Sequence, residues 1–517
     1  MQTKATPETV ILGGGDISLD QLIAVARHGA KVQLSEDPDW IARMQCGADY
    51  LQELLQSNEP LYGVNTGYGA SCGVSIPPHL VPELPLHLTR YHGCGLGRAL
   101  TEEASAAVLV ARLSSLAAGY SGVRMVLLER LVDLLNRGIF PVIPEEGSVG
   151  ASGDLTPLSY VAAVLLGERK VTYKGQIVEA CEAFEQEGLE PIVLLPKEGL
   201  ALMNGTSVMT GLACLAYDRA RNLLRLSAHI TTLAVESFLG NREHYRPDLF
   251  AKKPFVGQAQ VADWIYQSLS SKRELNTDHP LQDRYSLRCA PHVLGVLADA
   301  LPWMKAHIET ELNSANDNPL IDGLTRNVLH GGHFYGGHIA FVMDGMKTAV
   351  ANIADLLDRQ VALLTDPKSN NGLPGNLSGA QGERAAINHG FKAMQISISA
   401  WTAEALKGTM PASVFSRSTE CHNQDKVSMG TIAARDALRV IELTEQVAAG
   451  SLLAMNQALS IRLREGTLQR EALSPGLAQL HDQVNAVFPH LVEDRPMQED
   501  LENILLLIRD QALGCDE

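Results

Sequence analysis

The segment from 142 to 160, VIPEEGSVGASGDLTPLSY, contains residues that can generate an electrophile from the chain itself. At its centre lies Ala151-Ser152-Gly153, in a glycine-rich stretch whose backbone can turn tightly and adopt positive φ values. If the turn presses the Gly153 nitrogen against the Ala151 carbonyl carbon, the backbone can cyclise. Loss of water, including the Ser152 hydroxyl, then leaves a five-membered ring with an exocyclic methylidene. Such a ring is an electrophile that needs no external cofactor.

The same tripeptide has simpler explanations, because chance produces Ala-Ser-Gly in about one chain in five of this length. One alternative is a structural loop that enters a helix, with Asp154 as the N-cap and Pro157 in the first turn. Another is a serine hydrolase with Ser152 as nucleophile, but no GxSxG sequence surrounds this serine. Other reactive side chains must therefore distinguish a reactive ring from a structural loop.

A second glycine-rich segment, LYGVNTGYG at 61–69, contains a candidate base. Its three glycines predict a mobile loop, as a lid over a site requires, although a surface Ω-loop has the same composition. Tyr62, near its start, can remove a proton only as phenolate. Its pKa, ordinarily about 10, would have to be lowered by nearby hydrogen-bond donors or positive charge.

Two further motifs contain polar groups suited to a carboxylate. Tyr285 and Arg288 are three residues apart in DRYSLRC, and such a pair lies on one face of a helix. The guanidinium of Arg288 can bind a carboxylate through two parallel hydrogen bonds. Asn204, in LMNGT, is either the cap of a helix or a polar group of the same site. A solvent-exposed Tyr/Arg face is the structural alternative.

These motifs follow one another from Tyr62 to Gly430, and in this order the chain resembles the histidine, phenylalanine and tyrosine ammonia-lyase family. Its members carry the ring described above, 4-methylidene-imidazol-5-one (MIO). The resemblance therefore implies an MIO formed autocatalytically from Ala151-Ser152-Gly153, with no external cofactor. It also implies an enzyme, a carbon–nitrogen lyase that eliminates ammonia from an aromatic α-amino acid.

The resemblance assigns a role to each matched residue. Tyr62 is the base that removes the β-proton of the substrate. Arg288 binds the substrate α-carboxylate, and Tyr285 lies near the amine. Asn204 lies beside the ring and the carboxylate, and Phe334 packs beside the ring.

Four further residues are expected to bind the substrate: Tyr91, His92, Asn423 and Gln424. His92 suits a phenol or an imidazole, whereas phenylalanine-specific members of the family tend to carry Phe-Leu in place of Tyr91-His92. Histidine enzymes usually have Glu at the position of Gln424, and an amide holds an imidazole less well than a carboxylate does. The first expectation is therefore L-tyrosine, which would give 4-coumarate, followed by histidine and then phenylalanine.

Two departures from the family pattern and two alternative functions stay open. Tyr91 is bulkier than the Ser common at its position, and His333 replaces the usual Asn before Phe334. A 2,3-aminomutase, which adds ammonia back at the β-carbon, uses the same residues as a lyase. A non-catalytic family member acting as an assembly protein would keep the fold without modifying the tripeptide.

Two other patterns do not fit a cofactor or metal site. The glycines at 13–15 do not form a dinucleotide fingerprint, because Ser18 stands where GxGxxG requires its last glycine. His330, His333 and His338 lack the carboxylate or cysteine that would complete a recognisable metal-ligand pattern. No metal is therefore expected.

The composition excludes several classes of partner. The chain has 517 residues, of which 45% are hydrophobic, and a formal net charge of −17. This acidic balance argues against binding to nucleic acid or to an anionic membrane, and no apolar run approaches the ~18 residues of a membrane helix. Eight scattered cysteines without a CxxC pair are typical of reduced thiols. We expect a cytoplasmic enzyme whose partner is a small aromatic amino acid.

The fold is expected to be mainly α, with a core of long antiparallel helices and a smaller mixed N-terminal region that carries the MIO loop. Apolar residues at 343, 346, 350, 353, 357, 361 and 364 are spaced by three or four, which predicts one buried helix face. Similar patterns predict long helices at 378–406 and 430–464.

Three regions are predicted on this basis. Residues 1–200 form the N-terminal region with the lid and MIO loops, residues 201–464 the long-helix bundle, and residues 465–517 a set of shorter capping helices. The family assembles each site from several subunits of a tetramer. The resemblance therefore implies a homotetramer with sites shared between subunits.

Overall fold

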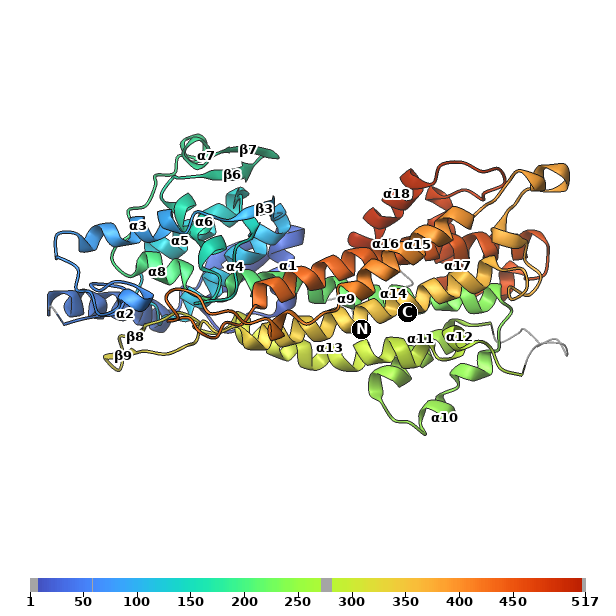
Figure 1. Cartoon of the computed structure of the whole chain (residues 1–517), viewed down its shortest axis with the longest axis horizontal. Helices are drawn as coiled ribbons and strands as arrows, with labels where there is room; N and C mark the ends of the chain where they lie inside the picture. The colour runs from blue at the N-terminus through green and yellow to red at the C-terminus, as the bar shows by residue number, and fades with distance from the viewer. Residues whose placement is uncertain (1–7, 58, 271–280, 514–517) are drawn as a thin grey trace. The chain divides into compact units, whose positions relative to one another are not determined.

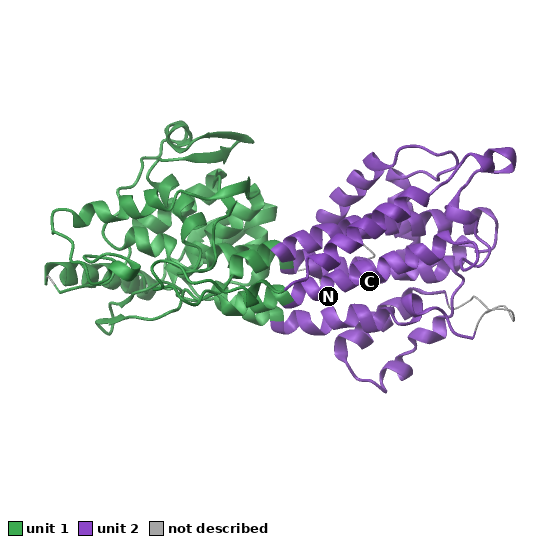
Figure 2. Ribbon diagram, in the orientation of Figure 1, with its two compact units in different colours: residues 1–216, 304–344, 411–435 green, residues 217–303, 345–410, 436–517 purple. Residues whose placement is uncertain are grey.

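The computed structural model describes residues 8–57, 59–270 and 281–513, and helices account for most of them (Figure 1). The mainly α fold predicted from the sequence is confirmed. The chain divides into two compact units (Figure 2). Unit 1 comprises residues 1–216, 304–344 and 411–435, and unit 2 comprises residues 217–303, 345–410 and 436–517. Each unit is assembled from segments that are far apart in the sequence.

Unit 1 contains a helix, α4 (Glu102–Ala117), that is buried from residue 104 to its end. This burial follows from its sequence, because small and apolar side chains occur all round the helix. The helix begins after Thr101, whose Oγ1 accepts a hydrogen bond from the Ala104 amide at 3.2 Å. The other helices of the N-terminal segment are α1 (Leu19–His28), α2 (Pro38–Gln56), α3 (Leu84–Tyr91), α5 (Met125–Arg137), α6 (Leu155–Leu165), α7 (Ala180–Glu187) and α8 (Glu198–Met203).

The strands in the described part of the chain are short and form small sheets. β3 (Leu96–Ala99) pairs antiparallel with β5 (Pro144–Glu146), which ends directly before the Ala-Ser-Gly loop. This pairing therefore anchors the entrance of the loop. The other pairs are parallel β1 (Thr9–Leu12) and β2 (Lys31–Leu34), antiparallel β8 (Leu320–Asp322) and β9 (Asn327–Leu329), and the antiparallel sheet β4 (Ile139–Pro141), β6 (Lys170–Tyr173) and β7 (Gln176–Glu179), in that order.

Four long helices follow: α9 (Ser207–Ser237), α13 (Ala290–Leu312), α14 (Gly337–Thr365) and α16 (Gly430–Arg464). α16 has the bounds predicted from the sequence, and all seven apolar positions of the stripe on α14 are fully buried. Polar contacts join these helices within unit 2. Gln360 of α14 donates to Thr231 Oγ1 of α9 at 3.1 Å, and Arg219 of α9 forms an ion pair with Glu445 of α16 at 2.7 Å.

The helix predicted at 378–406 begins later than expected, because α15 spans Lys392–Lys407. The preceding segment instead contains two short 3₁₀ turns, η4 (Gly375–Leu377) and η5 (Gly382–Ala386). Gly382 and Gly390 have φ values of 61° and 51°, which a right-handed helix does not allow. The apolar periodicity predicted the helix, but glycine conformations decided where it starts.

The remaining elements are short. They are α10 (Pro247–Phe250), α11 (Val256–Ser268), α12 (Tyr285–Arg288), α17 (Pro475–Val487) and α18 (Gln498–Arg509), with 3₁₀ turns η1 (Gly69–Ser71), η2 (Val81–Glu83), η3 (Arg242–Tyr245), η6 (Ala412–Val414) and η7 (Arg470–Ala472). Across the residues that the structure describes, no helix is both long enough and apolar enough to cross a membrane.

Candidate active site

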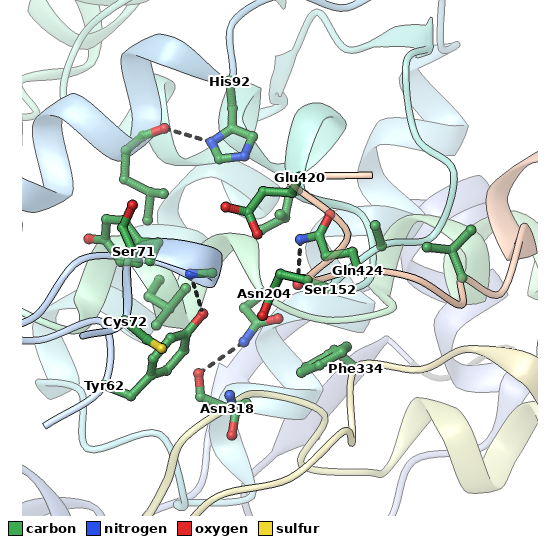
Figure 3. Close-up of a pocket in the computed structure, with 18 of the residues that line it drawn as sticks. Tyr62, Ser71, Cys72, His92, Ser152, Asn204, Asn318, Phe334, Glu420 and Gln424 are labelled. Atoms are coloured by element: carbon green, nitrogen blue, oxygen red, sulfur yellow. Dashed lines mark hydrogen bonds between the residues drawn. The ribbon is translucent and has the colours of Figure 1, made fainter. Parts of the chain in front are cut away.

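A cavity of about 820 Å³ in unit 1 gathers most of the residues predicted to form a site (Figure 3). Nine of them line it: Tyr62, Tyr91, His92, Ala151, Ser152, Asn204, Phe334, Asn423 and Gln424. They come from widely separated stretches of the chain, so the fold rather than the chain order brings them together. Gly153 completes the Ala-Ser-Gly turn beside the cavity, whereas His333 is exposed and is not among the lining residues.

The Ala-Ser-Gly loop is held in a tight turn against the segment that follows α8. Ser152 and Gly153 have φ values of 51° and 74°, both in the left-handed region. A Cβ on Gly153 would lie 2.1 Å from the Gly205 carbonyl oxygen, so only glycine fits at this position. The Asp154 amide donates to that oxygen at 2.8 Å, and the Gly205 amide donates to the Ser152 carbonyl at 3.3 Å. The turn is therefore strained and held from outside.

Asp154 occupies the N-cap position of α6, as predicted, but its side chain does not cap that helix. The carboxylate instead accepts hydrogen bonds from the Val208 and Met209 amides, at 3.0 and 2.9 Å, in the first turn of α9. It also accepts from Ser148 Oγ at 3.2 Å and from the Thr431 hydroxyl. Burial raises the pKa of Asp154 to about 6, although these donors oppose the rise. Asp154 thus ties the loop to α9 and α16.

Asn204 ends α8 and does not open the following helix, which starts at Ser207. Its Nδ2 donates to the Asn318 carbonyl at 2.9 Å, and its own carbonyl accepts from Nη1 of Arg112 at 3.1 Å. Its Oδ1 is buried and has no hydrogen-bond partner among the described residues. Because such an acceptor costs about 1–3 kcal/mol when unpaired, a donor on a bound molecule can stabilise the site by binding there.

Fully buried charged side chains fix the two asparagines in place. Arg112 contacts Asn204 as described, and a Cβ on the adjacent Gly205 would lie 2.3 Å from its Nη1. Lys197 forms an ion pair with Asp317, whose other oxygen accepts from the Asn318 amide at 2.6 Å. Burial lowers the pKa of Lys197, while the negative charge of Asp317 opposes this shift. These contacts position the backbone that carries Asn204 and Asn318.

Tyr62 lines the cavity, with its hydroxyl oxygen accepting a hydrogen bond from the Gly69 amide at 3.0 Å (Figure 3). Burial raises the pKa of Tyr62 above its ordinary value, and the negative charge of Glu420 raises it further. The Gly69 amide opposes this shift by stabilising the phenolate. The lowered pKa that a phenolate base would need is therefore not supplied by these surroundings.

Glu420 is a lining residue that the sequence analysis missed. Its two carboxylate oxygens accept from the Ala70 amide at 3.0 and 2.9 Å, and a Cβ on Gly69 would lie 2.3 Å from Oε2. The contact joins the 61–72 loop to the 419–424 loop. A signal was available, because Glu420 is the acidic residue four positions before Gln424 in TECHNQD.

His92 presents a hydrogen-bond acceptor to the cavity. Its Nδ1 lies 2.9 Å from the Leu88 carbonyl oxygen, which can only accept, so Nδ1 carries the proton (Figure 3). Burial lowers the pKa of His92, which favours the neutral ring. In that form Nε2 is an acceptor, and it has no hydrogen-bond partner among the residues that the structure describes. The neighbouring Tyr91 ring lies 4.3 Å from the His92 ring between centroids.

Gln424 contacts the Ala-Ser-Gly tripeptide directly. Its Nε2 donates to Ser152 Oγ at 3.2 Å, and its Oε1 accepts from Thr419 Oγ1 at 2.8 Å. The second bond fixes the orientation of the amide. Gln424 thus lies where it can contact both the Ser152 side chain and a bound molecule.

Tyr285 and Arg288 lie on α12 in unit 2 and do not line this cavity. The Arg288 guanidinium lies 4.7 Å from the centroid of the Tyr285 ring, so the two side chains do share one helical face. Arg288 donates to the Asp283 carbonyl at 2.9 Å and to Gln282 Oε1 at 3.1 Å. The Tyr285 side chain is 73% exposed. A single chain therefore contains no arginine from this motif in its cavity.

Comparison with known proteins identifies the family of this chain. The family model described as aromatic amino acid lyase matches residues 17–486, and the chain belongs to that family. It is therefore a carbon–nitrogen lyase, as the sequence predicts. The Ala-Ser-Gly tripeptide, the tyrosine loop and the polar motifs all lie inside the matched region.

Relatives with different reactions are similarly close. A histidine ammonia-lyase of Treponema denticola is 34% identical over 98% of this chain and 97% of its own length. A tyrosine 2,3-aminomutase of Chondromyces crocatus is 35% identical over 95% and 94%. The crystal structure of tyrosine aminomutase from Streptomyces globisporus has a TM-score of 0.90, with 33% identity over 98% of this chain and 97% of that one. These relatives establish the family, but they do not distinguish which amino acid is the substrate, so that question must be answered from the residues of the site.

Proposed function

We propose that this enzyme eliminates ammonia from L-tyrosine to give 4-coumarate. The observation that carries the proposal is the neutral His92, whose Nε2 is free to accept a hydrogen bond in the cavity. A phenol hydroxyl is a donor that matches this acceptor, whereas a phenyl ring leaves it unpaired. Gln424 has an uncharged amide where histidine enzymes usually have a carboxylate. This favours a substrate with a neutral side chain over one with an imidazole that can carry charge.

We further propose that Ala151-Ser152-Gly153 forms MIO, which supplies an electrophilic methylidene that activates the substrate amino group for departure. The chain fits such a ring, because the turn at Ser152 and Gly153 is already tight and is held by the Gly205 backbone. The unpaired Oδ1 of Asn204 can accept a hydrogen bond from the substrate amine. Tyr62 then removes the β-proton, and Phe334 packs beside the ring.

Histidine is the second candidate substrate, because an imidazole N–H can also donate to His92 and because the Treponema denticola relative is named a histidine ammonia-lyase. Phenylalanine is the third candidate. A 2,3-aminomutase is supported by the Chondromyces crocatus relative and would share every step up to release of ammonia.

Turnover of single amino acids tests these assignments. Purified enzyme is incubated separately with tyrosine, histidine and phenylalanine, and the conjugated acid is followed by ultraviolet absorbance. A dominant 4-coumarate signal supports the proposal, and a dominant urocanate signal replaces tyrosine by histidine. Chromatography of the tyrosine reaction for β-tyrosine distinguishes an aminomutase from a lyase.

Replacing Gln424 with glutamate is expected to shift preference from tyrosine toward histidine. A carboxylate can pair with a substrate imidazole, and a hydrogen bond to a charged group contributes about 1.5–3 kcal/mol. The ratio of kcat/KM for histidine to that for tyrosine should therefore rise about tenfold or more. Gln424→Asn, which shortens the amide without adding charge, is the matched control. An unchanged ratio in Gln424→Glu would remove Gln424 from the specificity argument.

We also propose that a homotetramer shares its sites between subunits, with Tyr285 and Arg288 supplied to the cavity of another chain. This accounts for two predicted binding residues that the cavity of one chain lacks. Tyr285 is 73% exposed and so accessible to a neighbour, and the partly buried Arg288 places its guanidinium over the Tyr285 ring. Arg288 of another subunit would then bind the α-carboxylate of the substrate and complete the site.

Mixing two inactive variants is expected to restore activity if sites are shared. Ser152→Ala and Arg288→Met are each expected to lose turnover, but co-expressed chains would include cavities with an intact Ser152 and an intact Arg288 from a neighbour. Activity of the co-expressed protein, compared with each variant alone, is the measurement. A double variant that carries both changes in one chain, co-expressed with wild type, is the control for subunit exchange. No recovery in a mixed oligomer would contradict shared sites.

A further inference from the structure

The C-terminal end of α3, which is followed by His92, is held by Arg169. Arg169 Nη2 donates to the Thr89 carbonyl at 2.8 Å, and Nη1 donates to Ser159 Oγ at 3.0 Å. Its guanidinium lies 4.3 Å from the centroid of the Tyr160 ring. A cation at this end also stabilises the partial negative charge of the helix carbonyls. Arg169 is thus fixed by three different kinds of contact.

Two local features show that the backbone is adapted to this guanidinium. A Cβ on Gly93, directly after His92, would lie 2.3 Å from Arg169 Nη2, so the glycine permits the close approach. Arg169 itself has a φ of 67°, a conformation that a non-glycine residue rarely adopts. The glycine at 93 and the unusual φ of Arg169 both accommodate the same contact.

Arg169 and His92 use adjacent carbonyls of the same helix turn. Thr89 O accepts from Arg169, while Leu88 O accepts from Nδ1 of His92 at 2.9 Å. Because Arg169 holds the turn, the Leu88 carbonyl stays in place for His92, which leaves Nε2 as the acceptor toward the cavity. The positive charge of Arg169 also lowers the pKa of His92, in addition to the larger effect of burial.

We propose that Arg169 is a positioning residue that determines substrate specificity, by holding His92 so that its Nε2 accepts a hydrogen bond from the substrate ring substituent. The inference rests on the proposed function, because it assumes that the aromatic ring of the substrate binds at His92. Arg169 does not line the cavity, so it acts on the substrate only through His92. Loss of Arg169 should therefore penalise substrates with a donor on the ring and spare phenylalanine.

The test compares ligands that differ only in this donor. The full chain and its Arg169→Gln, Arg169→Lys and Gly93→Ala variants are assayed with tyrosine, histidine and phenylalanine, and calorimetry measures binding of 4-coumarate, urocanate and cinnamate. In Arg169→Gln, kcat/KM for tyrosine should fall about tenfold, the scale of one neutral hydrogen bond, mainly through KM. Phenylalanine turnover and cinnamate binding should change less than about twofold. Gly93→Ala, which displaces the guanidinium, should match Arg169→Gln, and Arg169→Lys should retain part of the preference.

Arg90→Gln is the matched control. Arg90 lies on the same helix end and pairs with Glu168 at 2.6 Å, but its side chain is exposed and does not contact His92. The Arg90→Gln variant should keep the wild-type ratio of kcat/KM for tyrosine to that for phenylalanine. Equal losses for all ligands in Arg169→Gln, or an unchanged tyrosine-to-phenylalanine ratio, would overturn the inference. A wild type that prefers histidine would instead overturn the tyrosine assignment alone, and the inference would then be judged by the ratio of urocanate to cinnamate binding.

Discussion

Replacing Ser152 with alanine is expected to lower turnover by about 10³-fold or more, since loss of a covalent catalytic group removes at least that much rate. Alanine has no hydroxyl to lose, so the methylidene cannot form even if the backbone cyclises. The surrounding turn should persist, because the Gly205 contacts to this loop are made by backbone atoms. Steady-state turnover with the preferred amino acid is the measurement.

Peptide mass separates loss of the ring from loss of the fold. The wild-type peptide that contains residues 151–153 should be lighter than its sequence mass by two water molecules. The Ser152→Ala peptide should lose one water molecule at most, because alanine has no hydroxyl to lose. Ser71→Ala is the control, because Ser71 also faces the cavity but has no assigned role. It should keep the two-water deficit. An active Ser152→Ala enzyme, or an unmodified wild-type peptide, would be incompatible with MIO chemistry.

Replacing Tyr62 with phenylalanine is expected to lower kcat/KM by about 10²–10⁴-fold, the usual contribution of a positioned general base. The change removes a single oxygen, and the Gly69 amide that now donates to it at 3.0 Å loses its acceptor. Tyr68→Phe removes a hydroxyl from another tyrosine that lines the cavity and is the natural comparison. Near-wild-type turnover in Tyr62→Phe would assign the base to another group.

The pH profile of the same reaction tests the electrostatics around Tyr62. If Tyr62 acts as a phenolate base, kcat/KM should rise as pH rises toward the pKa of Tyr62, by about tenfold per pH unit. Burial and the charge of Glu420 both raise this pKa, so the rise should extend into the alkaline range. Glu420→Gln removes the negative charge while its amide oxygen can still accept from Ala70. The rise in kcat/KM of the Glu420→Gln variant should therefore occur at lower pH than in the wild type.

The amino group of the substrate also titrates in the alkaline range, but it is common to all variants. A shift between wild type and Glu420→Gln consequently reports the protein and not the substrate. If the rise in kcat/KM occurs at the same pH or at a higher pH in Glu420→Gln, Glu420 does not raise the pKa of Tyr62.

Much of the site could be predicted because its residues occur in short motifs whose order along the chain is distinctive. The tripeptide at 151–153, Tyr62 and His92 were singled out from short motifs and given roles by the resemblance to the family, and all of them lie at the cavity or beside it. Long helices were predictable for a related reason. The apolar stripe on α14 repeats every three or four residues, and α16 carries an uninterrupted pattern from Gly430 to Arg464.

Other features depended on contacts between distant segments. Asp154 was placed correctly at the start of α6, yet its carboxylate binds the first turn of α9, about fifty residues later. Glu420 entered the site only because its loop meets the one that contains Ala70. The late start of α15 depended on glycine conformations that apolar periodicity does not report.

The sequence by itself supplied the motifs on which the resemblance to the family rests, the candidate tripeptide and the types of side chain present, because these are matters of residue identity and order. Only the tertiary structure decided the pKa shifts of the site residues and which of these residues lie together at one cavity. The pKa of Tyr62 is raised by burial and by the charge of Glu420, and His92 presents Nε2 as an acceptor because its Nδ1 is bound to the Leu88 carbonyl. Tyr285 and Arg288 share a helical face, as their spacing predicts, but they belong to unit 2 and are not among the residues that line the cavity of unit 1. Burial, hydrogen-bond partners and distance are properties of the folded chain, so no local pattern could have supplied them.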